Sequence, residues 1–368
     1  MLEPRSWKSR LGMATTTHGQ LTSVANEQPA AEPAGFSATD SDTAPLKAGE
    51  APPRAAAGEL KLDLFSRILF YLTVGVLHLL SLLPDFILYP LGIVSGYVGY
   101  RLDRRRRKIG MRNLAIALPE CDQRQRRRVL RASYVNLGRS AAEYVRLGGF
   151  FYRRLKKRVV YNDRLDYWKE LRQRHSWKGL LILTAHLGNF ELLPAAHAMY
   201  GYQIDLVHHT QRFAAGEALM TFVRQRAGVG VIRKHAAARG VLRALRQGRT
   251  VGVAVDQNAK RSEAVFVPFF GEIASTSSGL ARLAAITGAP VLPVFIVRQP
   301  AKRTHRIEIQ DEIAMQRTGD AAADIEENTR RLVKAVEDMT RRFPEQFLWT
   351  HRRYRTRPIR GTPSVYGA

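Results

Sequence analysis

The chain has 368 residues, 58 of them Lys or Arg and 32 Asp or Glu, which gives a formal net charge of +26. The excess of positive charge indicates an anionic partner, such as nucleic acid, an anionic membrane surface or an acidic protein. The single cysteine, Cys121, excludes an internal disulfide and argues against a thiolate metal cluster.

Residues 1–58 are rich in Ala, Thr, Ser, Glu and Pro and lack apolar periodicity. This composition predicts a disordered tail. The segment also lacks the basic-then-apolar order of a signal peptide, so we do not expect it to be cleaved.

An apolar segment follows between Arg67 and Arg101, and its only formally charged residue is Asp85. Its first part, residues 68–83, would measure about 24 Å as a helix, whereas a bilayer core is about 30 Å thick. We therefore expect residues 59–108 to form a membrane anchor, either as one kinked or tilted span or as two helices within one leaflet. The alternative is a helical hairpin buried in a soluble core. The basic run at residues 104–108 favours the membrane, because anionic headgroups attract such clusters.

Residues 109–358 are predicted to form one α/β domain, followed by a C-terminal tail at 359–368. Amphipathic helices with a basic face are expected up to residue 160. Beyond them, four short apolar runs fit buried strands: GLLILTAH, YQIDLVHHT, TVGVAVDQ and APVLPVFIV. Helical stretches are expected between and after the strands, at 190–200, 216–226, 236–246, 279–287 and 324–342. The alternation predicts a mixed, largely parallel sheet flanked by helices.

The stretch LTAHLGNFELL, residues 183–193, places His186 five residues before Glu191. On one regular helix these residues would be about 140° apart, so they can meet only if His186 precedes the helix. Gly188 permits a turn there, and Pro194 suits a first helical turn. A carboxylate could then hold one imidazole nitrogen while the other accepts a proton. Because neither Ser nor Cys lies nearby as a nucleophile, the hydroxyl would belong to the substrate. A purely structural histidine is the alternative.

Several blocks in the same order make the chain resemble the late acyltransferases of lipid A biosynthesis, within the broader His-x4-Asp/Glu acyltransferases. They include RRRRKIGMRNLAIALPE, TAHLGNFELL, VRQRAGVGVIRK, LRALRQGRTVGVAVDQN and FPEQFLWTHRRYRTRP. The resemblance runs from about Leu62 to Pro358, and the N-terminal tail has no counterpart. It implies a glycerolipid acyltransferase-like fold behind the apolar anchor.

The resemblance implies that His186 is the general base and Glu191 its orienting partner. It also implies that Arg224 and Arg226 bind a substrate phosphate or the oxyanion, although either arginine could equally lie on a solvated helix face. Asp256 and Gln257 match a family block and are expected at the site, with a helix cap as the alternative for Asp256.

Ser275 and Thr276 are expected to cap a helix or to hold a phosphate at its N-terminus. Arg352 is expected on a basic rim that meets headgroup phosphates, although a plain surface tail fits nearly as well. Phe269 and Phe270 could line an acyl tunnel, but core packing is the simpler interpretation. His197, His208, His209 and His235 receive no role, and no metal or cofactor is expected.

The family resemblance implies acyl carrier protein as the acyl donor and an anionic glycolipid, a lipid A precursor, as the acceptor. It places the enzyme among inner-membrane lipids at the cytoplasmic face. An acyltransferase that acylates phosphatidylinositol mannoside or another (lyso)phospholipid from acyl-CoA is the nearest alternative. A nucleic-acid binder and a non-catalytic membrane scaffold are the alternatives from other classes, and no nucleic-acid partner is expected.

Overall fold

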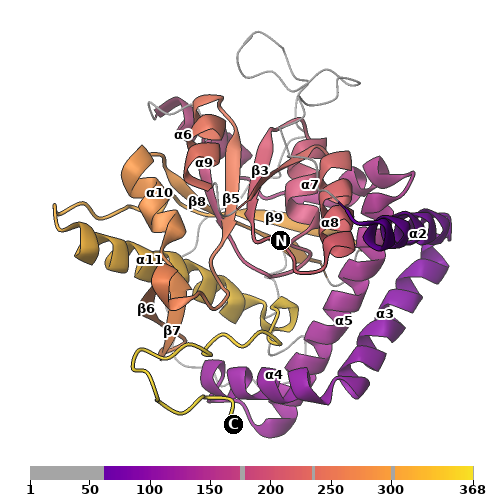
Figure 1. The fold of residues 1–368 in the computed structure, drawn as a ribbon, viewed down its shortest axis with the longest axis horizontal. Coiled ribbons are helices and arrows are strands. Elements are labelled where there is room, and N and C mark those ends of the chain that lie inside the picture. The colour runs from indigo at the N-terminus through magenta and orange to yellow at the C-terminus, as the bar shows by residue number, and fades with distance from the viewer. Residues whose placement is uncertain (1–61, 175–178, 234–236, 300–302, 368) are drawn as a thin grey trace, which may run out of the picture.

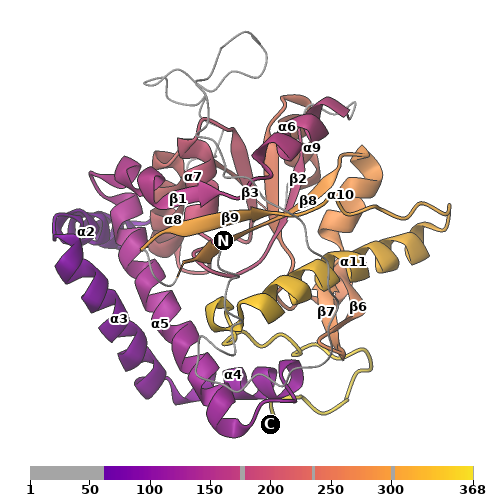
Figure 2. The same cartoon turned by 180° about the vertical axis from the view of Figure 1, so that it is seen from behind.

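The computed structural model describes residues 62–174, 179–233, 237–299 and 303–367. The expected disordered tail at 1–58 and His235 lie outside these residues. Figures 1 and 2 show a central sheet with helices on both faces and a group of helices along one side. The mixed, largely parallel α/β sheet expected from the sequence is confirmed.

The sheet has seven strands in the order β1-β9-β8-β2-β5-β3-β4. All neighbouring strands are parallel except β8 and β9. The strands are β1 (Val159–Tyr161), β2 (Leu181–Thr184), β3 (Ile204–His208), β4 (Val229–Arg233), β5 (Thr250–Ala254), β8 (Val291–Arg298) and β9 (His305–Ile309). A separate hairpin joins β6 (Ala264–Phe269) to β7 (Glu272–Ser277).

Side chains of the central strands alternate between two cores, as the two-residue period of a strand requires. In β2, Leu181 and Leu183 face one core, and Ile182 faces the other. The first core includes residues of α9 (Ala237–Arg246), α10 (Gly279–Thr287) and α11 (Ala321–Arg342). The second includes residues of α6 (Leu165–Arg174), α7 (Leu192–Met199) and α8 (Ala214–Arg226).

The remaining helices precede the sheet in the chain. They are α2 (Leu64–Ser81), α3 (Asp85–Leu102), α4 (Arg104–Ala117) and α5 (Gln123–Gly148). The apolar segment is thus two helices interrupted before Pro84, and not one continuous helix. Asp85, at the start of α3, pairs with Arg146 of α5 and with Arg158, which explains how a charge is accommodated in this segment.

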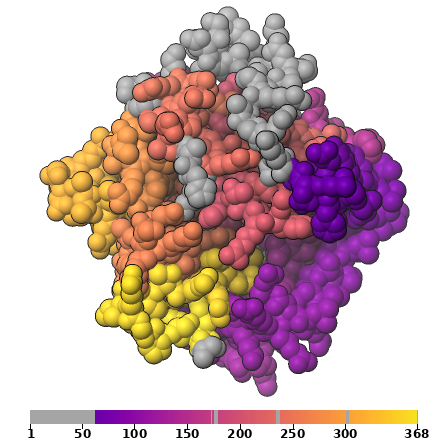
Figure 3. All heavy atoms as spheres, in the orientation of Figure 1, coloured from indigo at the N-terminus to yellow at the C-terminus, as the bar shows by residue number. Residues whose placement is uncertain are grey.

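The two apolar helices keep much of their hydrocarbon on the outside of the protein. Leu64, Phe65 and Leu79 of α2, like Phe86, Val94 and Leu102 of α3, are each more than half exposed. Figure 3 shows α2 in indigo at the surface. Large exposed apolar patches mark contact with a membrane or a partner, so the buried-hairpin alternative does not fit. By length and composition α2 could cross a membrane, and it is compatible with the expected anchor.

Helices α3 and α5 run side by side in both ribbon views (Figures 1 and 2). Their backbones can approach closely because glycines line the contact. A Cβ added at Gly138 of α5 would lie 2.1 Å from the Gly92 carbonyl oxygen and 2.7 Å from the Gly96 nitrogen of α3. Both contacts are with backbone atoms, which a rotamer change cannot relieve. The position therefore admits only glycine unless the helices separate.

We predict that Gly138→Ala lowers the free energy of unfolding by about 1–3 kcal/mol, because overpacking forces backbone shifts. Thermal unfolding of detergent-purified protein measures the change. Gly75→Ala in α2 is the matched control, since an added Cβ there meets nothing within 4 Å. An unchanged melting temperature for Gly138→Ala would contradict the contact.

Candidate active site

The ends of two neighbouring parallel strands bring together two residues that lie seventy positions apart in the sequence. In β2 and β5, Thr184 is in register with Ala254. His186 and Asp256 each lie two residues beyond these partners, so they leave the sheet side by side. The imidazole Nδ1 of His186 lies 2.9 Å from Oδ1 of Asp256 and 3.1 Å from Oδ2. Strand order thus forms the pair that local sequence spacing could not reveal.

This contact sets the tautomer of the imidazole. An ionised carboxylate can only accept, so Nδ1 carries the proton and Nε2 is the basic nitrogen. The side-chain amide of Gln257 donates to Nε2 at 3.1 Å. The His186 side chain keeps 23% of its surface exposed, so its basic nitrogen is near the surface.

The electrostatics of the pair are coupled. Burial lowers the pKa of His186, but the Asp256 carboxylate, helped by Glu191, outweighs it and the pKa is raised above the ordinary value. Burial raises the pKa of Asp256, but the imidazole and backbone donors outweigh that effect and the pKa is lowered. Asp256 therefore remains a carboxylate and favours the protonated form of His186.

Glu191 does not make the hydrogen bond to His186 that the sequence led us to expect. Its two carboxylate oxygens accept from Arg224 of α8, from Nη2 at 2.7 Å and from Nε at 3.0 Å. The partner of His186 is Asp256 instead, because β5 lies directly beside β2. Glu191 still acts on His186 through its charge, since it is close enough to raise the pKa of the imidazole.

Arg224 is itself buried, with 7% of its surface exposed. Burial lowers the pKa of its guanidinium, and Glu191 more than restores it. Among the described residues its Nη1 has no hydrogen-bond partner, and neither has the nearby hydroxyl of Tyr144, a residue that sequence reasoning missed. An arginine with two nitrogens fixed and one unused can bind an anion without reorganising.

The structure separates the other expected site residues. Arg226 lies over the ring of Tyr152, away from the Glu191–Arg224 pair. Ser275 and Thr276 belong to β7 and do not cap a helix. They are fully buried, and Ser275 donates to the Ala259 carbonyl while Thr276 accepts from Arg353. With their hydroxyls used internally, these two residues are not accessible to a phosphate.

His351 and Arg353, which the sequence placed with Arg352 on the basic rim, lie close to Asp256 instead. Arg353 is fully enclosed, and burial lowers its pKa to about 10, but it remains positive and near the Asp256 carboxylate. His351 accepts from the Asn258 amide at 3.0 Å, and burial lowers its pKa to about 4, so it is neutral. The basic cluster after Trp349 was visible in the sequence, but which of its members faces inward was not.

A second polar pair lies beside Arg224. His208, at the end of β3, contacts Glu217 of α8 at 2.8 Å, and Glu217 is also an electrostatic partner of Arg224. Burial lowers the pKa of His208. The two pairs together fix α8 against the carboxyl edge of the sheet. This contact could not be predicted from the sequence, because residues 208 and 217 match no spacing motif.

An apolar groove of about 410 Å³ begins at the candidate site. Glu191 and Phe190 lie in its wall, and the Phe190 ring packs edge-on against His186 with centroids 4.7 Å apart. The rest of the wall comes mainly from α2 and α5, including Val76, Leu80, Ala141 and Tyr144. The groove thus runs from Phe190 and Glu191, beside the imidazole, to the exposed apolar helix α2. Phe269 and Phe270, in contrast, pack in the core.

A basic cleft of about 1250 Å³ lies where α3, α4 and α5 meet the C-terminal residues. Its lining includes eight Arg or Lys side chains and no acid: Arg101, Arg105, Arg107, Lys108, Arg112, Arg127, Arg131 and Arg352. A smaller hollow shares Arg105 and Arg352 with it and extends to His351 and Asn258, beside Gln257. Arg352 is therefore on a basic rim, as expected, and this rim leads toward the candidate site.

An imidazole held by a carboxylate, a buried arginine and an apolar groove at one sheet edge are compatible with acyl transfer to a hydroxyl. The model of the family described as bacterial lipid A biosynthesis acyltransferase matches residues 56–356. The chain belongs to this family and is an acyltransferase of lipid A biosynthesis.

Characterised relatives cover most of the chain. The chain is 28% identical over 299 residues to the lipid A biosynthesis lauroyltransferase of Escherichia coli (strain K12). The alignment covers 81% of this chain and 94% of the relative. It is 28% identical to the palmitoleoyltransferase of the same organism, covering 80% and 92%. The myristoyltransferase of that organism is 22% identical and covers 78% and 87%.

We predict that Asp256→Asn lowers the pKa of His186 below its ordinary value, because burial then acts without the carboxylate that opposes it. An NMR titration of the His186 ring protons measures this shift. Asp103→Asn, at the partly exposed N-cap of α4, should leave the titration unchanged. A His186 pKa unaffected by Asp256→Asn would show that the two side chains do not interact in solution.

Proposed function

We propose that the protein transfers a fatty acyl chain from acyl carrier protein to a hydroxyl of a lipid A precursor, at the cytoplasmic face of the inner membrane. His186 would be the general base. The observation that carries the proposal is the His186 imidazole, held by Asp256 at the sheet edge, near an apolar groove between α5 and the exposed apolar helix α2. Family membership and the names of the relatives support a glycolipid acceptor.

In the proposed reaction, Nε2 of His186 removes the proton from the acceptor hydroxyl, which replaces the Gln257 amide at that nitrogen. The hydroxyl oxygen attacks the thioester carbonyl carbon and forms a tetrahedral oxyanion. The C–S bond then breaks, and the thiolate takes the proton from the imidazolium. Asp256 stabilises the imidazolium between these steps. Such proton transfer is typically worth about 10²–10⁴-fold in rate.

Arg224 is the proposed donor to the oxyanion or to a substrate phosphate. Its Nη1 is buried and has no partner among the described residues, while Glu191 fixes the other side of the guanidinium. A preorganised donor of this kind contributes about 10²–10³-fold to a rate in related chemistry. In this proposal Glu191 contributes by orienting Arg224 and through its charge near His186.

The two hollows beside the site suit the two ends of the substrates. The apolar groove suits an acyl chain, because only hydrocarbon needs to be accommodated along α2 and α5. The basic cleft suits the phosphates of an anionic glycolipid and the acidic surface of the donor protein. Arg352 lies at the end of the cleft that approaches the site.

We predict that His186→Ala abolishes transfer, with kcat reduced by about 10³-fold or more, since both the base and the returning acid are lost. Purified protein is assayed with acyl-acyl carrier protein or acyl-CoA and with a lipid A precursor or phosphatidylinositol mannoside. His209→Ala, an exposed histidine outside the site, is the control. Full activity of His186→Ala, or transfer to the mannoside alone, would refute the proposal. Mass spectrometry of lipid A from a deletion strain should show one acyl chain fewer.

We also predict that Ala141→Phe impairs long acyl chains more than short ones, because the larger side chain fills the groove beside α2. The ratio of kcat/KM for a twelve-carbon and a four-carbon thioester should fall by about 10-fold, the equivalent of about two methylenes of lost burial. Ala323→Phe, on the exposed start of α11, should leave the ratio unchanged. An equal effect of Ala141→Phe on both chain lengths would place the acyl chain elsewhere.

A further inference from the structure

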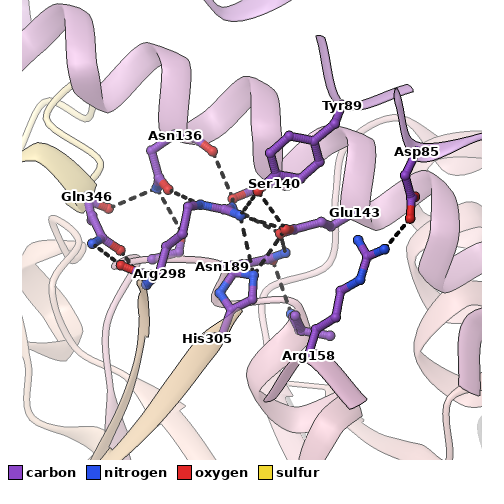
Figure 4. A network of polar contacts seen from close by, with 12 residues as sticks. Asp85, Tyr89, Asn136, Ser140, Glu143, Arg158, Asn189, Arg298, His305 and Gln346 are labelled. Carbon is purple, nitrogen blue, oxygen red and sulfur yellow. Dashed lines mark hydrogen bonds and ion pairs between the residues drawn. The ribbon is translucent and has the colours of Figure 1, made fainter. Parts of the chain in front are cut away.

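A buried carboxylate, Glu143 of α5, lies at the centre of a network of polar contacts that includes Asn189, Arg298 and His305 (Figure 4). Only 2% of its surface is exposed. Its two oxygens accept from Arg298 of β8, from His305 of β9 at 3.0 Å, from the Tyr89 hydroxyl of α3 at 3.2 Å and from Asn189 at 2.7 Å. One side chain thus joins α3, α5, two strands and the loop.

The charge of Glu143 is maintained by these donors. Burial raises its pKa, but His305 and Arg298 outweigh burial and hold the pKa far below the ordinary value. Burial lowers the pKa of His305, so the imidazole donates as a neutral group. A buried ion with all its partners in place is rigid, because any movement would leave a charge unpaired.

Asn189 connects this network to the loop. Its Nδ2 donates to Glu143, and its Oδ1 accepts from the Leu192 backbone at the start of α7. Asn189 lies between His186 and Glu191 in the sequence, so the contact fixes the middle of the loop that separates them.

Backbone contacts hold the rest of the loop. Leu348 donates to the His186 carbonyl at 3.0 Å, and Gly188 donates to the Gln346 carbonyl at 3.0 Å. Gly188 has φ +65°, and a Cβ there would lie 1.8 Å from the Ile296 carbonyl oxygen. The loop therefore fits one conformation. Three side-chain contacts tie it to helices: the Asn189–Glu143 hydrogen bond, the Glu191–Arg224 pair, and Asn136 of α5, whose Nδ2 donates to the Gly188 carbonyl at 3.2 Å. Of these, the Asn189–Glu143 bond holds the middle of the loop by one of its own side chains.

We propose that Glu143 and Asn189 are positioning residues, which fix the separation between the imidazole of His186 and the Glu191–Arg224 pair. The proposal rests on the proposed function, because its consequence is a rate. A loop displaced by about 1 Å costs about 10²-fold in reactions that depend on alignment. Loss of the tie should therefore reduce kcat and leave substrate binding nearly unchanged.

Two substitutions at Asn189 remove the donor to Glu143 and retain an acceptor for the Leu192 amide. Asn189→Ser is neutral, and serine commonly accepts from a backbone amide at the start of a helix. Asn189→Asp sets two carboxylates against each other, so the pair takes up a proton as the pH falls and regains a donor.

We expect both variants to reduce kcat by about 10-fold or more at pH 8, with each KM within about 2-fold of wild type. The ratio of variant to wild-type kcat should rise toward one for Asn189→Asp between pH 8 and pH 6, and should stay constant for Asn189→Ser. Titration of His186 affects wild type and Asn189→Ser alike. In Asn189→Asp the added carboxylate would raise the His186 pKa and lower the ratio toward pH 6, which is opposite to the expected rise. Hydrogen exchange of the peptide containing residues 186–192 should be faster in both variants, and this readout does not require activity.

Asp205→Asn is the matched control. Asp205 is as deeply buried as Asn189, and it pairs with Arg249 at 2.5 Å near the amino end of β3, whereas the candidate site lies at the carboxyl edge of the sheet. It should lower stability without changing kcat, its pH ratio or exchange in the loop. Wild-type kcat and loop exchange in folded Asn189→Ser, or a constant pH ratio for Asn189→Asp, would overturn the positioning role. If Asn189→Asp does not fold, the Asn189→Ser result decides. Inactive wild-type protein, or active His186→Ala, would instead refute the proposed function.

Discussion

The hydrogen bond between His186 and Asp256 depends on the register of two parallel strands. Because Thr184 of β2 lies opposite Ala254 of β5, the two side chains that follow emerge together at the carboxyl edge of the sheet. The imidazole acquires its tautomer from this contact, and its raised pKa mainly from the same carboxylate, with help from Glu191. The helices on both faces stabilise the register, since each strand contributes alternate side chains to the two cores. The site is therefore a consequence of the sheet as a whole.

Charges beneath the site are buried in pairs, and each pair joins elements that come from different parts of the chain. Glu191 with Arg224 joins the His186 loop to α8, and Glu143 with Arg298 joins α5 to β8. Buried pairs of this kind add little net stability compared with apolar packing, but breaking one leaves an uncompensated charge. Their main effect in this fold is to define geometry. Substitutions there should alter the alignment of groups more than the compactness of the protein.

Much of the fold could be read from the sequence because apolar periodicity reports burial directly. The runs containing β2, β3, β5 and β8 were recognised, and α10 was predicted at residues 279–287, where it lies. The hairpin of β6 and β7 was missed, since its polar residues do not form a continuous apolar run. The position of His186 before a helix was anticipated from Gly188 and Pro194. Its pairing with Asp256 was not, because strand order depends on contacts between distant segments. The predicted cap or phosphate site at Ser275 and Thr276 was wrong for the same reason, because the tertiary fold decides which groups a hydroxyl contacts.

The groove between α2 and α5 is bounded by a helix whose outer surface is also hydrocarbon. An acyl chain that enters the groove from a bilayer would move from the hydrocarbon core of the membrane into an apolar protein groove. Exposing a twelve-carbon chain to water would cost about 9 kcal/mol, at about 0.8 kcal/mol per methylene. A route along α2 avoids most of that barrier, so the helix expected to anchor the protein would also be the entrance for the acyl chain.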